Sequence, residues 1–397
     1  MSLKKRKAFQ DLLLNIIGAA IPIGLLQLAI LPSIASSMSS EAYGFALTII
    51  SFFSMCPAAL GNSLNNIRLI RERDYEKANI KGDFPILFLI LVFLCISATT
   101  FFLLAYGQHT DPSFFIILIT SIMYLAQAYY ITAYLIQIDY GKVFLNQIFL
   151  ALGYIAGLGI YHLGGPWEII YFAGQLFSLI HLFLTTAIWR EPLVRTPFFT
   201  ETAKDTFYIT VATGLSRFIG YADRILLFPL LGGALVSVYY VSTLFGKILS
   251  MIVGPVSNVV LTYLSRHSKK TDALFGTALV SGLVVCIFGY FLVVILSYPA
   301  LSVLYPQFVN EAMPYIYINT AAAFISALFS LMSPFILKFF SIKWQICISL
   351  VTSVLYIVLA LFLVKSFGLW GFCIAVLFVN IVQFFMVIFI YRFAHEK

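Results

Sequence analysis

Three basic residues and one carboxylate lie inside apolar stretches of the sequence, where charge is costly. Residues 214–231 read GLSRFIGYADRILLFPLL and contain Arg217, Asp223 and Arg224, and Lys247 lies within the next apolar stretch. A charged side chain at the centre of a bilayer costs about 2.5–3.5 kcal/mol on insertion scales. Because positive charges outnumber the negative one, the sequence predicts a cationic cavity in which Arg217, Arg224 and Lys247 bind an anionic substrate.

The positions of these charges along a helix leave a second interpretation open. At about 100° per residue, Arg217 and Arg224 project from nearly the same helix face, whereas Asp223 lies about 120° from Arg217. Arg217 is too deep to reach the interface easily, but Arg224 is close enough to the outer end of its stretch to snorkel. The alternative is therefore that these charges brace helices against each other, with Asp223 as an ion-pairing partner.

Uncharged polar side chains also recur deep in the apolar stretches. Gln27, Gln127 and Asn319 are candidates for a polar cavity lining, because amides and aromatic faces bind sugars and the chain is 17% aromatic. Hydrogen bonding between helices is, however, the commoner role of any single amide. His181 lies deep as well, and a lone histidine is more often a packing residue than a proton relay.

The composition identifies the environment of all these residues. The chain has 397 residues, of which 61% are hydrophobic and only 10% charged, and its mean hydropathy is +0.99. A soluble domain carries about 25% charged residues, whereas apolar stretches of about 20 residues are typical of membrane-spanning helices. The sequence therefore predicts an all-α polytopic membrane protein.

Twelve spans with both termini in the cytoplasm account for the apolar stretches and for the basic residues. Twenty of the 24 Lys and Arg residues then lie on cytoplasmic segments, three lie within spans, and only Lys365 lies outside. This asymmetry is typical of membrane proteins. The net charge of +8 is explained by basic loops beside anionic lipids, so membrane lipids are expected partners and nucleic acid is not. The predicted spans are 12–36, 43–63, 84–106, 114–136, 143–162, 168–189, 206–230, 236–261, 273–297, 314–337, 344–364 and 370–391.

The two halves of the chain resemble each other. A glutamine or arginine, a proline and a tyrosine recur at a constant offset, and a basic loop at 67–81 has a counterpart at 266–270. Six spans per half is an even number, which predicts parallel repeats around a central cavity. We therefore expect an N-terminal six-helix lobe at 1–200 and a C-terminal six-helix lobe at 201–397. The recurring pairs are Gln27 and Arg224, Pro32 and Pro229, and Tyr43 and Tyr240.

Motifs for catalysis are missing from the sequence. It has no GxxxxGK[ST] loop for ATP, no HExxH metal motif and no GxSxG nucleophile motif. The predicted outer loops carry only scattered carboxylates. We therefore expect that the protein is not an enzyme and that it has no catalytic residues, no metal site and no cofactor.

Two segments carry a resemblance to a known family. Residues 15–46 resemble the start of Wzx-type polysaccharide flippases, which belong to the multidrug/oligosaccharidyl-lipid/polysaccharide (MOP) exporter superfamily. That start has a glycine and prolines in the first span and a Tyr-Gly pair opening the second. Residues 221–244, YADRILLFPLLGGALVSVYYVSTL, look like the family's seventh span, with an Asp-Arg pair before an apolar run. The matching residues of the first segment are Gly18, Pro22, Pro32, Tyr43 and Gly44.

The resemblance implies a substrate and a mechanism. The substrate is an undecaprenyl-diphosphate-linked oligosaccharide repeat unit, moved by alternating access from the inner to the outer leaflet of the bacterial inner membrane. O-antigen, lipopolysaccharide or capsule is then the end product, and a polysaccharide polymerase and a chain-length regulator are expected partners. The resemblance also implies coupling to a proton or sodium gradient. Asp223 is the candidate residue for this coupling, because it is the carboxylate within the apolar stretches.

Other classes of function remain open. One alternative is a MATE-like multidrug exporter of the same fold, which extrudes organic cations and favours an acidic cavity. The surplus of positive charge in the apolar stretches argues against this alternative. The chain could instead be a membrane-embedded glycan ligase or polymerase. It would then act on lipid-linked sugar in detergent, where no second leaflet is present. An assembly subunit without transport of its own is the remaining alternative.

Overall fold

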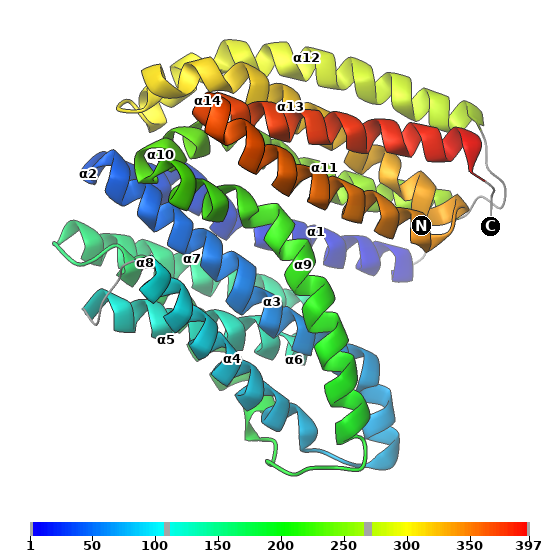
Figure 1. Cartoon of the computed structure of the whole chain (residues 1–397). Helices are drawn as coiled ribbons and strands as arrows, with labels where there is room; N and C mark the ends of the chain where they lie inside the picture. The colour runs from blue at the N-terminus through cyan, green and yellow to red at the C-terminus, as the bar shows by residue number, and fades with distance from the viewer. Residues whose placement is uncertain (1–2, 107–111, 266–271, 395–397) are drawn as a thin grey trace. The chain divides into compact units, whose positions relative to one another are not determined.

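The computed structural model describes residues 3–106, 112–265 and 272–394, and every regular element within them is a helix (Figure 1). The predicted basic loop at 266–270 lies outside the described residues. The elements are α1 (Leu3–Leu25), η1 (Leu26–Ile30), α2 (Leu31–Ser37), α3 (Ser40–Ala78), α4 (Asp83–Ala105), α5 (Pro112–Tyr130), α6 (Thr132–Ile136), α7 (Tyr140–His162), α8 (Glu168–Thr185), η2 (Ile188–Arg190), α9 (Phe199–Leu231), α10 (Gly233–Ser242), α11 (Leu244–Ser265), α12 (Asp272–Leu304), α13 (Val309–Phe339) and α14 (Ile342–Phe393).

Nine helices among the described residues are long and apolar enough to cross a membrane. The last of them, α14, is two helices joined at Gly368, whose φ of 55° and ψ of −135° are not helical. Glycine tolerates this left-handed φ because it has no Cβ. The predicted spans 344–364 and 370–391 fall on the two parts. The protein is therefore a multi-pass helical membrane protein, while the number twelve and the side of each terminus stay predictions.

Two predicted loops are partly helical. The segment 67–81 was expected to be a loop, but α3 continues to Ala78. The predicted spans 168–189 and 206–230 leave a connection between them, but α9 begins inside this connection at Phe199. Hydropathy detects the end of an apolar run and not the end of a helix, so polar helical extensions beyond the membrane escape it.

The first span is interrupted as its prolines suggest. A π-helical turn, η1, covers Leu26–Ile30 and lies between Pro22 in α1 and Pro32 in α2. Proline has no N–H to donate, so the helix widens locally where a regular bond is missing. Gln27, one of the predicted cavity residues, lies in this π-helical turn.

The chain forms two compact units. Unit 1 comprises residues 1–34 and 48–225, and unit 2 comprises residues 35–47 and 226–397. The helices α3 and α9 each contribute residues to both. These units follow contacts, whereas the predicted lobes at 1–200 and 201–397 follow the sequence repeat, and the lobes stay a prediction.

Unit 2 contains contacts between residues that the repeat relates. The hydroxyl of Ser237 donates a hydrogen bond of 2.7 Å to the carbonyl oxygen of Ser40, and the rings of Tyr43 and Tyr240 meet edge to face with centroids 6.3 Å apart. Both pairs are separated by 197 residues, the offset at which residues of the two halves recur in the sequence. Gly44 allows this approach, since a Cβ there would lie 1.8 Å from the carbonyl oxygen of Gly233.

Each unit has its own apolar core. In unit 1, Leu64, Ile67, Phe84 and Leu125 are buried together where α3, α4 and α5 meet. In unit 2, a larger cluster joins α12, α13 and α14, and the rings of Phe275 and Tyr391 stack within it at 3.7 Å.

Candidate functional site

Arg224 is a buried guanidinium on α9. Its side chain is 8% exposed, and its Nη1 donates a hydrogen bond of 2.8 Å to the hydroxyl of Ser51 on α3. The hydroxyl of Tyr106, just beyond the end of α4, donates at 2.9 Å to the carbonyl oxygen of Ile225. Two elements of unit 1 therefore hold α9 at the level of Arg224.

Neither Asp223 nor Arg217 forms an ion pair with a described residue. The Asp223 carboxylate accepts the backbone N–H of Arg224 at 2.9 Å, and it forms no ion pair with any described basic residue. Arg217, half-buried on the same helix, also has no ion pair in the described part of the chain. The structure thus gives no support to a structural pair between Asp223 and the arginines of α9.

Lys247 lies on α11 in unit 2. Its Nζ lies 3.5 Å from the centroid of the Tyr240 ring, a distance at which a cation is attracted to the face of an aromatic ring. The structure therefore places Arg217, Asp223 and Arg224 on one helix of unit 1 and Lys247 in the other unit.

The three predicted polar residues have separate surroundings. Gln27 is half-buried in η1, and Gln127 is half-buried on α5. Asn319 on α13 is 4% exposed, and its amide donates a hydrogen bond of 2.7 Å to the hydroxyl of Ser242 in α10. Asn319 thus makes the bond between helices that was the alternative to a cavity role.

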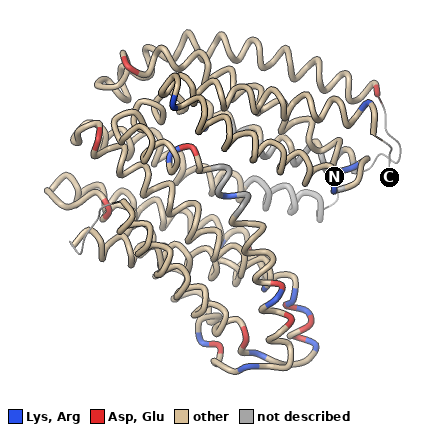
Figure 2. Tube along the Cα trace, viewed as in Figure 1, with Lys and Arg blue, Asp and Glu red and all other residues tan. Residues whose placement is uncertain are grey.

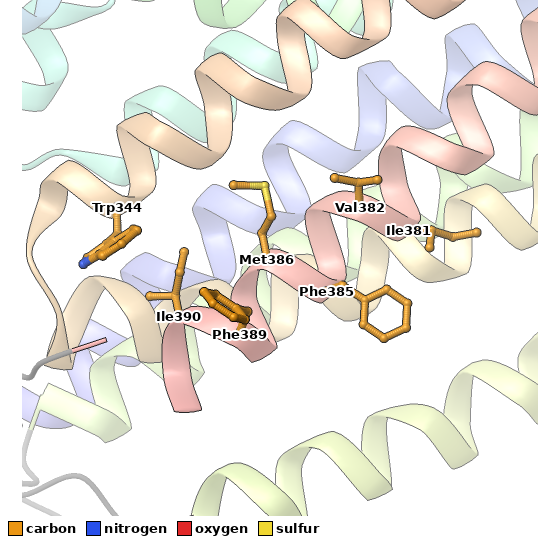
Figure 3. Close-up of a pocket in the computed structure, with 7 residues that line it drawn as sticks. All are labelled: Trp344, Ile381, Val382, Phe385, Met386, Phe389 and Ile390. Atoms are coloured by element: carbon orange, nitrogen blue, oxygen red, sulfur yellow. The ribbon is translucent and has the colours of Figure 1, made fainter. Parts of the chain in front are cut away.

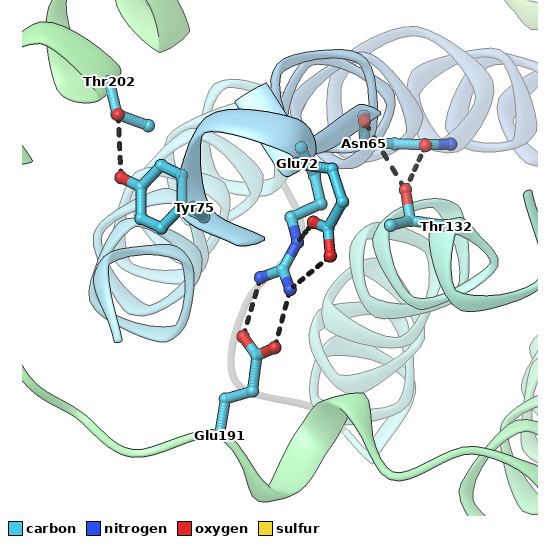
Figure 4. A network of polar contacts seen from close by, with 7 residues as sticks. Asn65, Glu72, Tyr75, Thr132, Glu191 and Thr202 are labelled. Atoms are coloured by element: carbon cyan, nitrogen blue, oxygen red, sulfur yellow. Dashed lines mark hydrogen bonds and ion pairs between the residues drawn. The ribbon is translucent and has the colours of Figure 1, made fainter. Parts of the chain in front are cut away.

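A charged cluster at the end of α3 was not anticipated. Arg68, 6% exposed, makes two parallel bonds of 2.7 and 2.6 Å to the Glu191 carboxylate and one of 2.5 Å from its Nε to Glu72 (Figure 4). The guanidinium also lies 4.4 Å from the centroid of the Phe84 ring. The spacing of Arg68 and Glu72 by four residues was the only sequence signal, since Glu191 is 123 residues away.

A second arginine joins the same end of α3 to α9. Arg71 contacts Asp205 at 2.5 Å and Glu201 at 3.4 Å, both in the first turns of α9. Figure 2 shows charged residues of both signs along these segments. Because both arginines contact carboxylates on other segments, this end of unit 1 is a structural junction.

A buried carboxylate completes the junction. Asp83, at the start of α4, is 0% exposed and accepts hydrogen bonds of 2.7 Å from the hydroxyl of Tyr75 and from the backbone N–H of Thr196. It also accepts the Thr196 hydroxyl, while Tyr75 lies 2.9 Å from the Thr202 hydroxyl (Figure 4). The linker before α9 is thereby fastened to α3 and α4.

His181 is part of a buried hydrogen-bonded group in unit 1. Its Nδ1 lies 3.2 Å from the Tyr134 hydroxyl and 3.4 Å from the Asn146 amide, and its ring stacks on Phe149 at 4.7 Å. Asn146 also exchanges bonds of 2.9 Å with Ser178. These contacts are those of the packing residue that was the more common interpretation.

The described residues contain no group of three His, Cys, Asp or Glu side chains that would hold a metal ion.

Comparisons with known proteins identify the fold. No family model and no curated protein sequence matches the chain. Among solved structures, the lipid II flippase MurJ in an inward closed conformation is similar over 96% of this chain and 86% of its own, with a TM-score of 0.68 and 15% identity.

Two MATE structures show the same likeness. An inward-facing multidrug resistance MATE transporter of the MOP superfamily matches 95% of this chain and 97% of its own, with a TM-score of 0.63 and 15% identity. The Vibrio cholerae MATE transporter VcmN in a bent form matches 98% and 96%, with a TM-score of 0.59 and 11% identity. At these identities the likeness concerns the fold, and the chain has the helical fold that MATE transporters and MurJ share.

Proposed function

We propose that the chain is a flippase for lipid-linked oligosaccharides. It would move undecaprenyl-diphosphate-linked repeat units from the inner to the outer leaflet of the bacterial inner membrane, for O-antigen or another surface polysaccharide. The likeness to a structure described as a lipid II flippase supports a lipid-linked substrate. The Wzx-like segments at 15–46 and 221–244 support the same class.

The observation that carries the proposal is the environment of Arg217. Its side chain is half-buried on α9 and forms no ion pair within the described part of the chain. Asp223, six residues further on the same helix, accepts a hydrogen bond from backbone and also forms no ion pair with a described basic residue. The positive charge of Arg217 is therefore available to a diphosphate, which arginine binds through charge-assisted hydrogen bonds.

The mechanism follows from the chemistry of such a substrate. Its prenyl tail stays in the bilayer, while its anionic, hydrated head group must cross about 30 Å of hydrocarbon. Arg217, Arg224 and Lys247 would offset the loss of water from the diphosphate, and alternating access would expose it to each side in turn. The chain has no ATP-binding motif, so a proton or sodium gradient would supply the energy, with Asp223 as the candidate carboxylate. A polysaccharide polymerase and a chain-length regulator would receive the flipped units.

The test replaces α9 arginines in cells that depend on this chain for their surface polymer. We expect Arg217→Ala and Arg224→Ala to lower surface polymer at least about tenfold, since a hydrogen bond to a charged group contributes about 1.5–3 kcal/mol. Lipid-linked units should accumulate at the inner leaflet, and Arg217→Lys should retain part of the function because its charge survives.

The control is Lys365→Ala, which changes an exposed basic residue of a predicted outer loop and should leave polymer unchanged. Normal polymer in Arg217→Ala at wild-type protein abundance would contradict the assignment. Extrusion of cationic dyes by the purified chain in vesicles would favour the multidrug exporter instead. Lengthening or transfer of the glycan in detergent would favour a polymerase or ligase.

A further inference from the structure

An apolar groove lies along the second part of α14. It encloses about 400 Å³ and is bounded by the first part of the same element at Trp344 (Figure 3). Two of its walls, Phe385 and Phe389, are each 61% exposed, so the groove opens at its rim. The lining residues are Trp344, Ile381, Val382, Phe385, Met386, Phe389 and Ile390.

The length of the groove matches one leaflet of a bilayer. The lining residues of 381–390 follow each other at steps of one and three, which keeps them on one stripe of a helix. Nine residue steps at 1.5 Å each make the stripe about 13 Å long. That is close to half of the roughly 30 Å hydrocarbon core, so the groove accommodates a chain from a single leaflet.

Basic residues flank one end of this groove. Lys343 precedes the lining residue Trp344, and Arg392 follows Ile390 by two positions. Both side chains are exposed, and neither forms an ion pair within the described part of the chain. Tryptophan is enriched where the hydrocarbon meets the head groups, which places this end of the groove at the head-group level.

Two further charged residues lie at the same end of unit 2. Lys338 is in the last turn of α13, and Asp272 is the first residue of α12. The stacking of Phe275 on Tyr391 brings the start of α12 to the end of α14. Among the described residues, this end therefore has three positive charges and one negative charge, a balance that favours an anion.

We propose that this groove binds an anionic phospholipid. One acyl chain lies along the stripe from Ile381 to Ile390, and the head-group phosphate lies between Lys343 and Arg392. The leaflet is the one that faces the basic segments, where anionic lipids attract Lys and Arg and basic pockets between helices bind anionic head groups. An acyl chain matches a groove of one leaflet, whereas an undecaprenyl tail is much longer. The site therefore does not depend on the proposed transport substrate.

The experiment measures lipid bound to the full chain, purified in detergent and exchanged into nanodiscs. The discs contain phosphatidylcholine with increasing phosphatidylglycerol, and retained lipid is counted by native mass spectrometry after release into detergent. The wild-type chain should retain phosphatidylglycerol in preference to phosphatidylcholine. Lys343→Gln combined with Arg392→Gln should weaken that retention about 25-fold, about fivefold for each charge removed.

Substitutions in the groove test the position of the acyl chain. Met386→Trp fills the groove and should reduce the retained phosphatidylglycerol. Phe385→Ala removes part of the exposed rim and should also reduce it, and this variant serves as the test if Met386→Trp does not fold. Lys365→Gln, an exposed basic residue away from the groove, is the matched control and should bind as the wild type does. Thermal melting of each variant shows that it is folded.

Three outcomes would overturn the proposal. The first is equal retention of phosphatidylcholine and phosphatidylglycerol by the wild type, and the second is unchanged selectivity in the variant that lacks both charges. The third is displacement of phosphatidylglycerol by equimolar undecaprenyl phosphate, which would assign the groove to a prenyl tail. None of these outcomes depends on transport, so failure here leaves the proposed function to its own test.

Discussion

Arg68 and Arg224 are buried to almost the same degree, and we propose different roles for them. Their side chains are 6% and 8% exposed. Arg68 has two carboxylates, from Glu72 and Glu191, whereas the described side-chain bond of Arg224 is to a neutral hydroxyl. The comparison separates two uses of one residue type. At the end of α3 the charge fastens segments to each other, whereas the proposed function assigns the charge on α9 to a substrate.

The largest effect is expected at Arg68. Arg68→Ala should lower the free energy of unfolding by about 3–5 kcal/mol, because removing one partner of a buried ion pair leaves uncompensated charge. Here the remaining charges are two neighbouring carboxylates. The measurement is thermal unfolding in detergent, followed by circular dichroism.

Arg73→Ala is the matched control for this change. Arg73 is an exposed arginine on the same helix, and a surface substitution of this kind changes stability by less than about 0.5 kcal/mol. If the two variants unfold at the same temperature, the cluster at Arg68 is not a structural junction. The structural role that the comparison assigns to Arg68 would then be wrong.

A smaller effect in the same region is expected at Asp83. Asp83→Asn should cost about 1–3 kcal/mol, since the amide presents an NH₂ group to donors from Thr196 and Tyr75. The loss of negative charge at the start of α4 adds to this through the helix dipole.

Thermal unfolding in the same detergent measures the cost at Asp83. The control is Asp74→Asn, whose side chain is 54% exposed and 4.0 Å from Arg71, and it should have little effect. A cost at Asp83 no larger than at Asp74 would show that the buried carboxylate does not stabilise the junction.

The sequence predicted one side of this comparison far better than the other. The intramembrane charges of α9 were identified from residue type alone, because any charge in an apolar run of that length is conspicuous. The junction was missed because its members lie in a polar helical extension, where charge is ordinary. Arg68 and Glu191 are separated by 123 residues, and no local spacing reveals such a pair.

The same limit applies to the fold. Hydropathy predicted helices at each apolar stretch, and the repeat offset of 197 reappears in the contact between Ser40 and Ser237. It did not predict the extension of α3 to Ala78 or the hydrogen bond from Arg224 to Ser51, which lies 173 residues away. Polar contacts between distant segments decide these details.

The smallest effect on stability is expected at Arg224 itself, and it decides the comparison. On the proposed function the charge of Arg224 serves the substrate and not the fold, and replacing buried charge by apolar groups of similar volume is often neutral, as Arg224→Met would do. We therefore expect a change of about 1 kcal/mol or less, measured by the same thermal unfolding in detergent.

Leu227→Ala, at a fully buried position on the same helix, shows whether that assay detects a defect in α9. It should cost about 2–5 kcal/mol by leaving a cavity. Suppose that Arg224→Met destabilises the chain as much as Arg68→Ala does. Arg224 would then be a structural charge like Arg68, and a lipid-linked diphosphate would no longer be needed to explain why α9 carries it.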